Sequence, residues 1–145
     1  MNTNTRLTTV APDLVELGKG LPASKRKALA RLIAEWACRE TGTMTLLGED
    51  RVKLLLDDAH TVTQQDRDRL AGDVDDLDEK YFAIVEQHDG LDDEGDALKW
   101  FRKARAAASL LYSLDSDSVP EFCETLYEAQ AATDDLDNLK ALCRR

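Results

Sequence analysis

Residue types that break or cross-link secondary structure are scarce in this chain of 145 residues. It contains 3 prolines, 7 glycines and 3 cysteines, and aromatic residues make up 6% of it. Val, Ile and Thr nowhere alternate with polar residues for long, which argues against β-strands. The composition is dominated by charged residues, Ala and Leu, most of which favour helix. The sequence therefore predicts an all-α protein.

Long apolar runs are also missing. No stretch approaches the ~18–20 apolar residues that a membrane-spanning helix needs. The segment from Met1 to Val10 is polar, unlike a secretory signal. Cys38, Cys123 and Cys143 are odd in number and far apart, which fits neither a disulfide framework nor a zinc motif. We therefore expect a reduced, cytoplasmic protein.

The stretch from Asp96 to Leu114 is predicted to form the central helix. Its apolar residues recur at three- and four-residue steps and make a broad face, which is typical of a helix with several neighbours. Further helices are expected over residues 9–18, 24–40, 49–62, 63–88 and 119–132, and from 133 or 134 onward. Short connections predict a compact antiparallel bundle of about five to six helices. Residues 1–145 are expected to form a single domain, with 1–8 frayed.

Periodicity also assigns inward and outward positions. In the helix over 24–40 we expect Leu32 and Trp36 on the buried face and Cys38 on the opposite side. In the helix over 49–62 we expect Ala59 to face inward and Leu54 outward. In the helix over 63–88, the inward positions follow the 4-3-4-3 spacing of packed bundles. They are Leu70, Val74, Leu77, Tyr81 and Ile84.

Negative charge is concentrated in one quarter of the chain. Residues 63–98 hold 13 acids and 3 bases, a net charge of −10, which equals the net charge of the whole chain. A nucleic acid or an anionic membrane needs a basic surface to bind, so this imbalance argues against either as a partner. It favours either a basic protein partner or a role in solubility alone.

The acids of this region are predicted to form an anionic ridge and an adjoining loop. On the helix over 63–88, one line of acids lies opposite the buried face, and at ~1.5 Å rise per residue it is roughly 27 Å long. The loop that follows adds further acids and should continue the ridge. The candidate partner-binding residues are Asp68, Asp75, Asp76, Glu79, Glu86, Asp89, Asp92, Asp93 and Glu94.

Catalytic and metal-binding motifs are not found, so we expect no enzyme and no cofactor. A di-metal site in a helical bundle needs Glu-x-x-His on two helices, and Asp57-x-x-His60 is the only near match. The acidic loop over 89–96 supplies no EF-hand register, because neither Gly90 nor Gly95 at position 6 gives the required ligands. His60, His88 and the three cysteines have no assignable role beyond structure.

A group of bases begins the central helix within this acidic region. Arg105 flanks the buried face and is predicted to pair with an acid of the preceding helix. Lys99, Arg102 and Lys103 are predicted to face solvent.

Two functions remain open at this level. The first is an inhibitor-type module that neutralises a basic partner, such as a nucleic-acid-cleaving toxin, through the ridge and loop. This profile is similar in physical type to that of small acidic immunity proteins, although no family motif is present. The second is a structural or adaptor protein that uses an apolar interface and keeps its acids for solubility. The oligomeric state is left open by both.

Overall fold

Four long helices make up most of the computed structural model, which describes residues 6–87 and 95–144. They are α3 (Ala23–Glu40), α6 (Gln64–Gln87), α7 (Asp96–Ser113) and α8 (Val119–Thr133). Within the described residues every regular element is a helix, which confirms the all-α prediction. None of these helices is long and apolar enough to cross a membrane.

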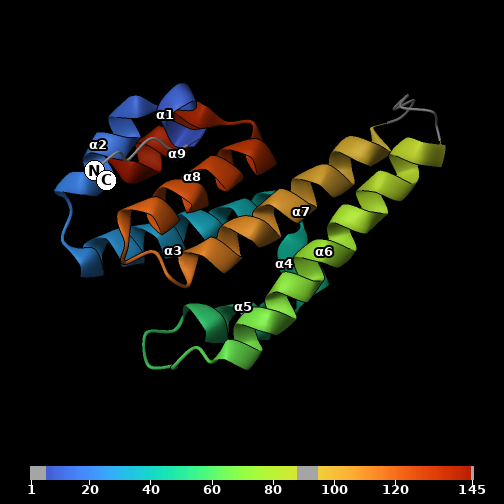
Figure 1. The fold of residues 1–145 in the computed structure, drawn as a ribbon, viewed down its shortest axis with the longest axis horizontal. Helices are drawn as coiled ribbons and strands as arrows, with labels where there is room; N and C mark the ends of the chain where they lie inside the picture. Colours follow the sequence, from blue (N-terminus) through green and yellow to red (C-terminus); the bar gives the residue numbers. More distant parts are fainter. Residues whose placement is uncertain (1–5, 88–94, 145) are drawn as a thin grey trace.

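The central position of α7 is confirmed. It packs against α6 on one side and α8 on the other, and it also contacts α3. Figure 1 shows α6 and α7 running antiparallel and side by side, and the end of the pair where α6 ends and α7 begins projects from the rest of the molecule. The alanines at 104 and 106–108 are all buried, and such small side chains let neighbouring helices approach closely. The Sγ atom of Cys38, on α3, lies 3.6 Å from the carbonyl oxygen of Ala106.

The N-terminal segment is more ordered than the sequence predicts. Instead of one helix over 9–18 there are two, α1 (Arg6–Val10) and α2 (Pro12–Gly20), which meet at Ala11. Both pack on α8, and Leu7 is fully buried there. The expected fraying therefore does not extend to residues 6–8. A Cβ atom at Gly18 would lie 2.6 Å from the Phe122 ring, so this close approach requires glycine.

The region between α3 and α6 differs most from the prediction. A short helix, α4 (Thr43–Leu47), occupies what was expected to be a plain connection. The next helix, α5 (Glu49–Leu56), ends six residues before the predicted Val62. The cause is local: a side-chain oxygen of Asp57 accepts a hydrogen bond from the backbone N–H of Ala59 at 2.9 Å, which makes a turn. Ala59 is consequently exposed and not inward.

The buried face of α3 is rotated from the predicted one. Cys38 is fully buried, whereas Leu32 is 43% exposed and Trp36 is half-buried. The helix packs against both α7 and α8, so it buries two adjacent faces. Its N-cap is Pro22, which makes no side-chain hydrogen bond to the helix.

Side chains cap the start of several other helices. At the start of α6, Thr63 accepts a hydrogen bond from the N–H of Asp66, and Asp66 accepts one from the N–H of Thr63, both at 3.0 Å. Ser118 caps α8 by accepting from the N–H of Glu121. The last helix, α9 (Leu136–Cys143), is capped by Asp135 and not by Thr133 or Asp134.

Candidate functional site

The side of α6 that faces the protein is fixed by apolar packing. Leu70 and Leu77 are buried against the core, and the rings of Tyr81 and Phe101 lie 5.5 Å apart between centroids. Val74 is half-buried on the same stripe. The predicted heptad face of this helix is therefore confirmed.

Acids that flank this apolar stripe are paired with arginines of neighbouring elements. Asp73 accepts a hydrogen bond from Arg51 of α5 at 2.6 Å. Asp78 accepts two from Nη2 of Arg105 on α7, at 2.7 and 3.0 Å. The predicted pairing of Arg105 with the preceding helix is thus confirmed. These contacts hold α6 at a fixed rotation about its axis.

Acids on the opposite side of α6 are exposed. Asp68 accepts a hydrogen bond from Gln64, one turn away on the same helix, at 2.9 Å. The other four form no hydrogen bond or ion pair with any residue that the structure describes. They are Asp75, Asp76, Glu79 and Glu86. With Asp68 they form what we call the acidic face. The remaining predicted site residues, Asp89, Asp92, Asp93 and Glu94, lie outside the described residues.

An aromatic side chain that the sequence analysis did not single out lies on the same side. Phe82 is 61% exposed, the highest value among the large apolar residues of the described chain. It lies three residues after Glu79 and four before Glu86, so all three share one side of the helix. Among the described residues, its ring contacts that of Tyr81, at 5.2 Å between centroids. The sequence did indicate that this side chain is exposed, because Phe82 falls outside the inward positions of the heptad pattern.

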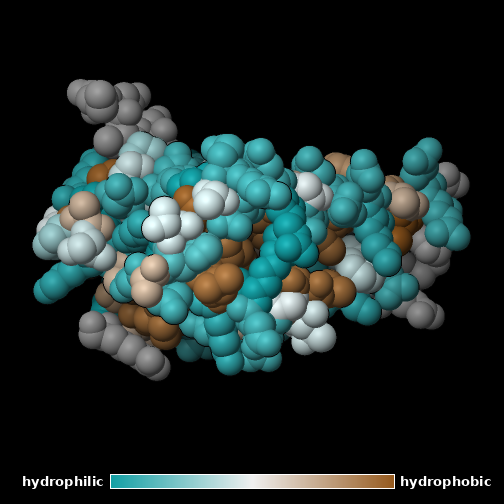
Figure 2. All heavy atoms as spheres, turned by 90° about the horizontal axis from the view of Figure 1, so that it is seen from below, coloured by the Kyte–Doolittle hydropathy of each residue, from teal (hydrophilic) through white to brown (hydrophobic). Residues whose placement is uncertain are grey.

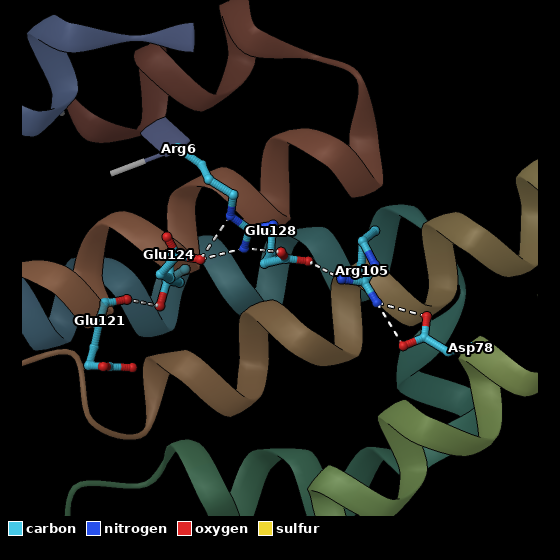
Figure 3. Close-up of polar contacts among 7 residues, drawn as sticks. Arg6, Asp78, Arg105, Glu121, Glu124 and Glu128 are labelled. Atoms are coloured by element: carbon cyan, nitrogen blue, oxygen red, sulfur yellow. Dashed lines mark hydrogen bonds and ion pairs between the residues drawn. The ribbon is translucent and has the colours of Figure 1, made fainter. Parts of the chain in front are cut away.

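A buried carboxylate links the helices behind the acidic face. Glu128 of α8 is 1% exposed and binds two arginines: Nη2 of Arg6 at 2.6 Å and Nη1 of Arg105 at 2.8 Å. Figure 3 shows Glu128 between these arginines, with Asp78 beyond Arg105. Burial lowers the pKa of Arg6, but its hydrogen bonds to Glu124 and Glu128 outweigh this and raise it. The network joins α1, α8, α7 and α6.

The cysteines have the environment of buried, inactive thiols. All three side chains are buried, and none is part of a disulfide. Burial raises the pKa of Cys38 to about 12 and that of Cys143 to about 11. A nucleophilic cysteine needs a lowered pKa, so neither of these two thiols is activated.

Histidine and metal chemistry receive no support in the described residues. Nε2 of His60 lies 3.0 Å from Asp66, which is already part of the α6 cap, and His88 lies outside the described residues. No group of three or more His, Cys, Asp or Glu side chains in the ranges 6–87 and 95–144 is placed to hold a metal ion.

Figure 2 views the molecule from the side of α5 and the start of α6, where hydrophilic residues cover most of the surface and apolar patches interrupt them. Leu54 of α5 is 53% exposed, as predicted, and Leu46 of α4 is 50% exposed. Leu114 is buried and Trp100 half-buried, so neither is as accessible as these leucines.

Comparison with known proteins gives no further guide to the site. No protein-family model matches the chain, and no curated protein or solved structure matches it.

Proposed function

We propose that this is a small acidic protein-binding module that neutralises a basic partner through the acidic face of α6, as an inhibitor or immunity protein does. The supporting observation is the division of acids on α6. Asp73 and Asp78 hold the helix in place, whereas the acids opposite them have no charged partner in the described residues. Structural roles account for the first group and leave the second available.

The acidic face suits a partner that normally binds nucleic acid. Its carboxylates are fixed on a helix of 24 residues whose rotation is set by core packing and ion pairs. Regularly spaced negative charges on a rigid support resemble a phosphate backbone and would compete for the same cationic cleft. Charge complementarity of this kind accelerates association, and the effect falls with salt. A nucleic-acid-cleaving toxin is the class of partner that fits best.

Phe82 adds an apolar contact within the acidic face. Interface energy is concentrated in a few large side chains, and aromatic residues are prominent among them. A partner with an apolar pocket bordered by Lys or Arg would match both features of this surface.

A second candidate function is an adaptor that binds through apolar side chains, and the exposure of Leu46 and Leu54 favours it. In that case the acidic face would serve solubility. The two proposals differ in salt dependence, because screening weakens exposed charge contacts much more than apolar ones.

Capture of the tagged protein from its own cells tests the proposal. The resin is washed at low and then at high salt, and the retained proteins are identified by mass spectrometry. One stoichiometric basic protein that is released by salt would support the acidic face as the binding site. A neutral partner that survives high salt would favour the adaptor, and retention of no partner would contradict both.

A further inference from the structure

A cavity of about 320 Å³ lies apart from the acidic face, between the ends of three helices. Its walls come from the C-terminal ends of α3 and α8 and the first turns of α7. The lining residues are Glu40, Thr41, Lys99, Arg102, Ala132 and Thr133. The volume is at the lower end of the ~300–1,000 Å³ that small-molecule sites occupy.

Arg102 lacks the partners that a half-buried arginine usually has. Its Nε atom is shut off from solvent without a hydrogen bond, and the guanidinium makes no hydrogen bond or ion pair within the described residues. Arg31 and Arg105 also have an unpartnered Nε, but their Nη atoms bind Asp58 and Asp78 respectively. The Nη atoms of Arg102 have no partner within the described residues, so they are the donors that a ligand in the cavity would meet.

Two lysines add positive charge beside Arg102. Lys99 lines the cavity, and Lys103 donates a hydrogen bond from Nζ to the carbonyl oxygen of Thr41 at 2.5 Å. Burial and the charge of Lys99 lower the pKa of Lys103. The prediction that Arg102 and Lys103 face solvent is therefore wrong, since both are half-buried. Lys103 already donates to the Thr41 carbonyl oxygen, so this oxygen is not a hydrogen-bond partner for Arg102.

The other walls of the cavity are negative. Glu40 contributes a carboxylate, and both α3 and α8 end at the cavity, where helix C-termini carry partial negative charge. A simple anion would be repelled by these walls, and a simple cation would be repelled by Lys99 and Arg102. A molecule with both charges satisfies both sets of walls.

We infer that this cavity binds a small zwitterion of amino-acid size, with its carboxylate at Arg102 and Lys99 and its ammonium at Glu40. The inference is independent of the proposed function, because the lining contains no residue of α6. It assigns a ligand-binding role to bases that the acidic face does not use.

Titration of the full-length ¹⁵N-labelled protein tests the inference, with glycine, β-alanine and 4-aminobutyrate as probes of increasing charge separation. We expect saturable amide shifts around residues 40, 99, 102 and 133 with at least one probe. Acetate and methylammonium, which carry one charge each, should bind at least about tenfold more weakly. Absence of saturable shifts with every zwitterion up to about 50 mM, or equal binding of acetate, would overturn the inference.

Substitutions distinguish binding at this cavity from a nonspecific effect of the protein's net charge. Arg102→Gln should weaken binding of the best probe at least about tenfold, because it removes a charged hydrogen-bond donor. Arg69→Gln is the matched control, since Arg69 is exposed on α6 with no ion pair in the described residues, and it should leave binding unchanged. If Arg102→Gln does not fold, Glu40→Gln gives the same test from the ammonium side. A folded variant of either residue that binds like the wild type would refute the site.

Discussion

Arg105 and Asp78 join the central helix to the acidic helix through a single guanidinium nitrogen, which lies 2.7 and 3.0 Å from the two carboxylate oxygens. The other terminal nitrogen of Arg105 donates to Glu128 at 2.8 Å. Glu128 is almost wholly removed from water, so its charge depends on Arg105 and Arg6. This arrangement fixes α6 with its acidic face outward.

Replacement of Arg105 by alanine should therefore destabilise the protein. The variant leaves Glu128 buried with Arg6 alone and removes the cation from Asp78, so we expect a loss of about 2–4 kcal/mol in the free energy of unfolding. Urea denaturation followed by circular dichroism measures it. Arg69→Ala, which removes an exposed arginine from α6, should change stability by less than about 0.5 kcal/mol. Equal stability of the two variants would show that the network contributes little.

The raised thiol pKa values predict a loss of stability in alkaline solution. Between the ordinary value of 9.0 and the folded values of about 12 for Cys38 and about 11 for Cys143, the folded chain keeps thiol protons that the unfolded chain loses. The contribution is fully present below pH 9 and is lost as pH rises above it. Each thiol lowers stability by up to ~1.4 kcal/mol per pH unit.

Urea denaturation of the wild type at pH 8 and pH 10 checks this dependence. We expect the two thiols to lower the free energy of unfolding by about 2–3 kcal/mol between these pH values. Cys143→Ala, near the chain terminus, should reduce the pH-dependent loss by roughly half this amount. An identical pH dependence in the variant would argue that the thiol of Cys143 is not buried in solution.

The buried face of a helix was predicted more accurately where the helix has a single neighbour. The helix α6 has one principal neighbour, α7, so a single heptad stripe described it, and its observed range of Gln64–Gln87 lies within one residue of the prediction. The helix α3 packs on two helices, and the burial of Cys38 could not be inferred from one stripe. The early end of α5 had a local signal in Asp57, which the periodicity analysis overlooked.

Contacts between distant segments account for the other errors. Leu7 and Arg6 are ordered because they meet α8 more than a hundred residues later in the chain, which no local pattern records. Arg102 lies in a cavity made by the ends of three helices, so its half-buried position could not be predicted from the local sequence either. The exposed acids of α6 were predictable because their line is opposite a strongly periodic buried face.

Phe82 is predicted to contribute to partner binding and not to folding. Phe82→Ser should leave the free energy of unfolding within about 1 kcal/mol of the wild-type value, because an exposed side chain loses little on substitution. It should reduce the affinity for the captured partner at least about tenfold. Leu46→Ser, which removes an exposed apolar residue from α4, is the matched control. Full retention of affinity in Phe82→Ser would exclude an aromatic contact at the acidic face.

The central claim is that the acidic face of α6 binds a basic protein, and charge reversal tests it most directly. One variant carries Asp75→Lys, Glu79→Lys and Glu86→Lys. The control carries Glu16→Lys, Asp117→Lys and Asp137→Lys, which are exposed acids of α2, the turn before α8, and α9. Both variants change the net charge from −10 by the same amount.

The measurement is the amount of basic partner that each variant retains from cells at low salt, with circular dichroism to confirm folding. We expect the control to retain the partner and the α6 variant to lose it while remaining folded, because only the second removes the complementary charges. Equal retention by the two variants would contradict the claim and would leave the acids of α6 a role in solubility alone.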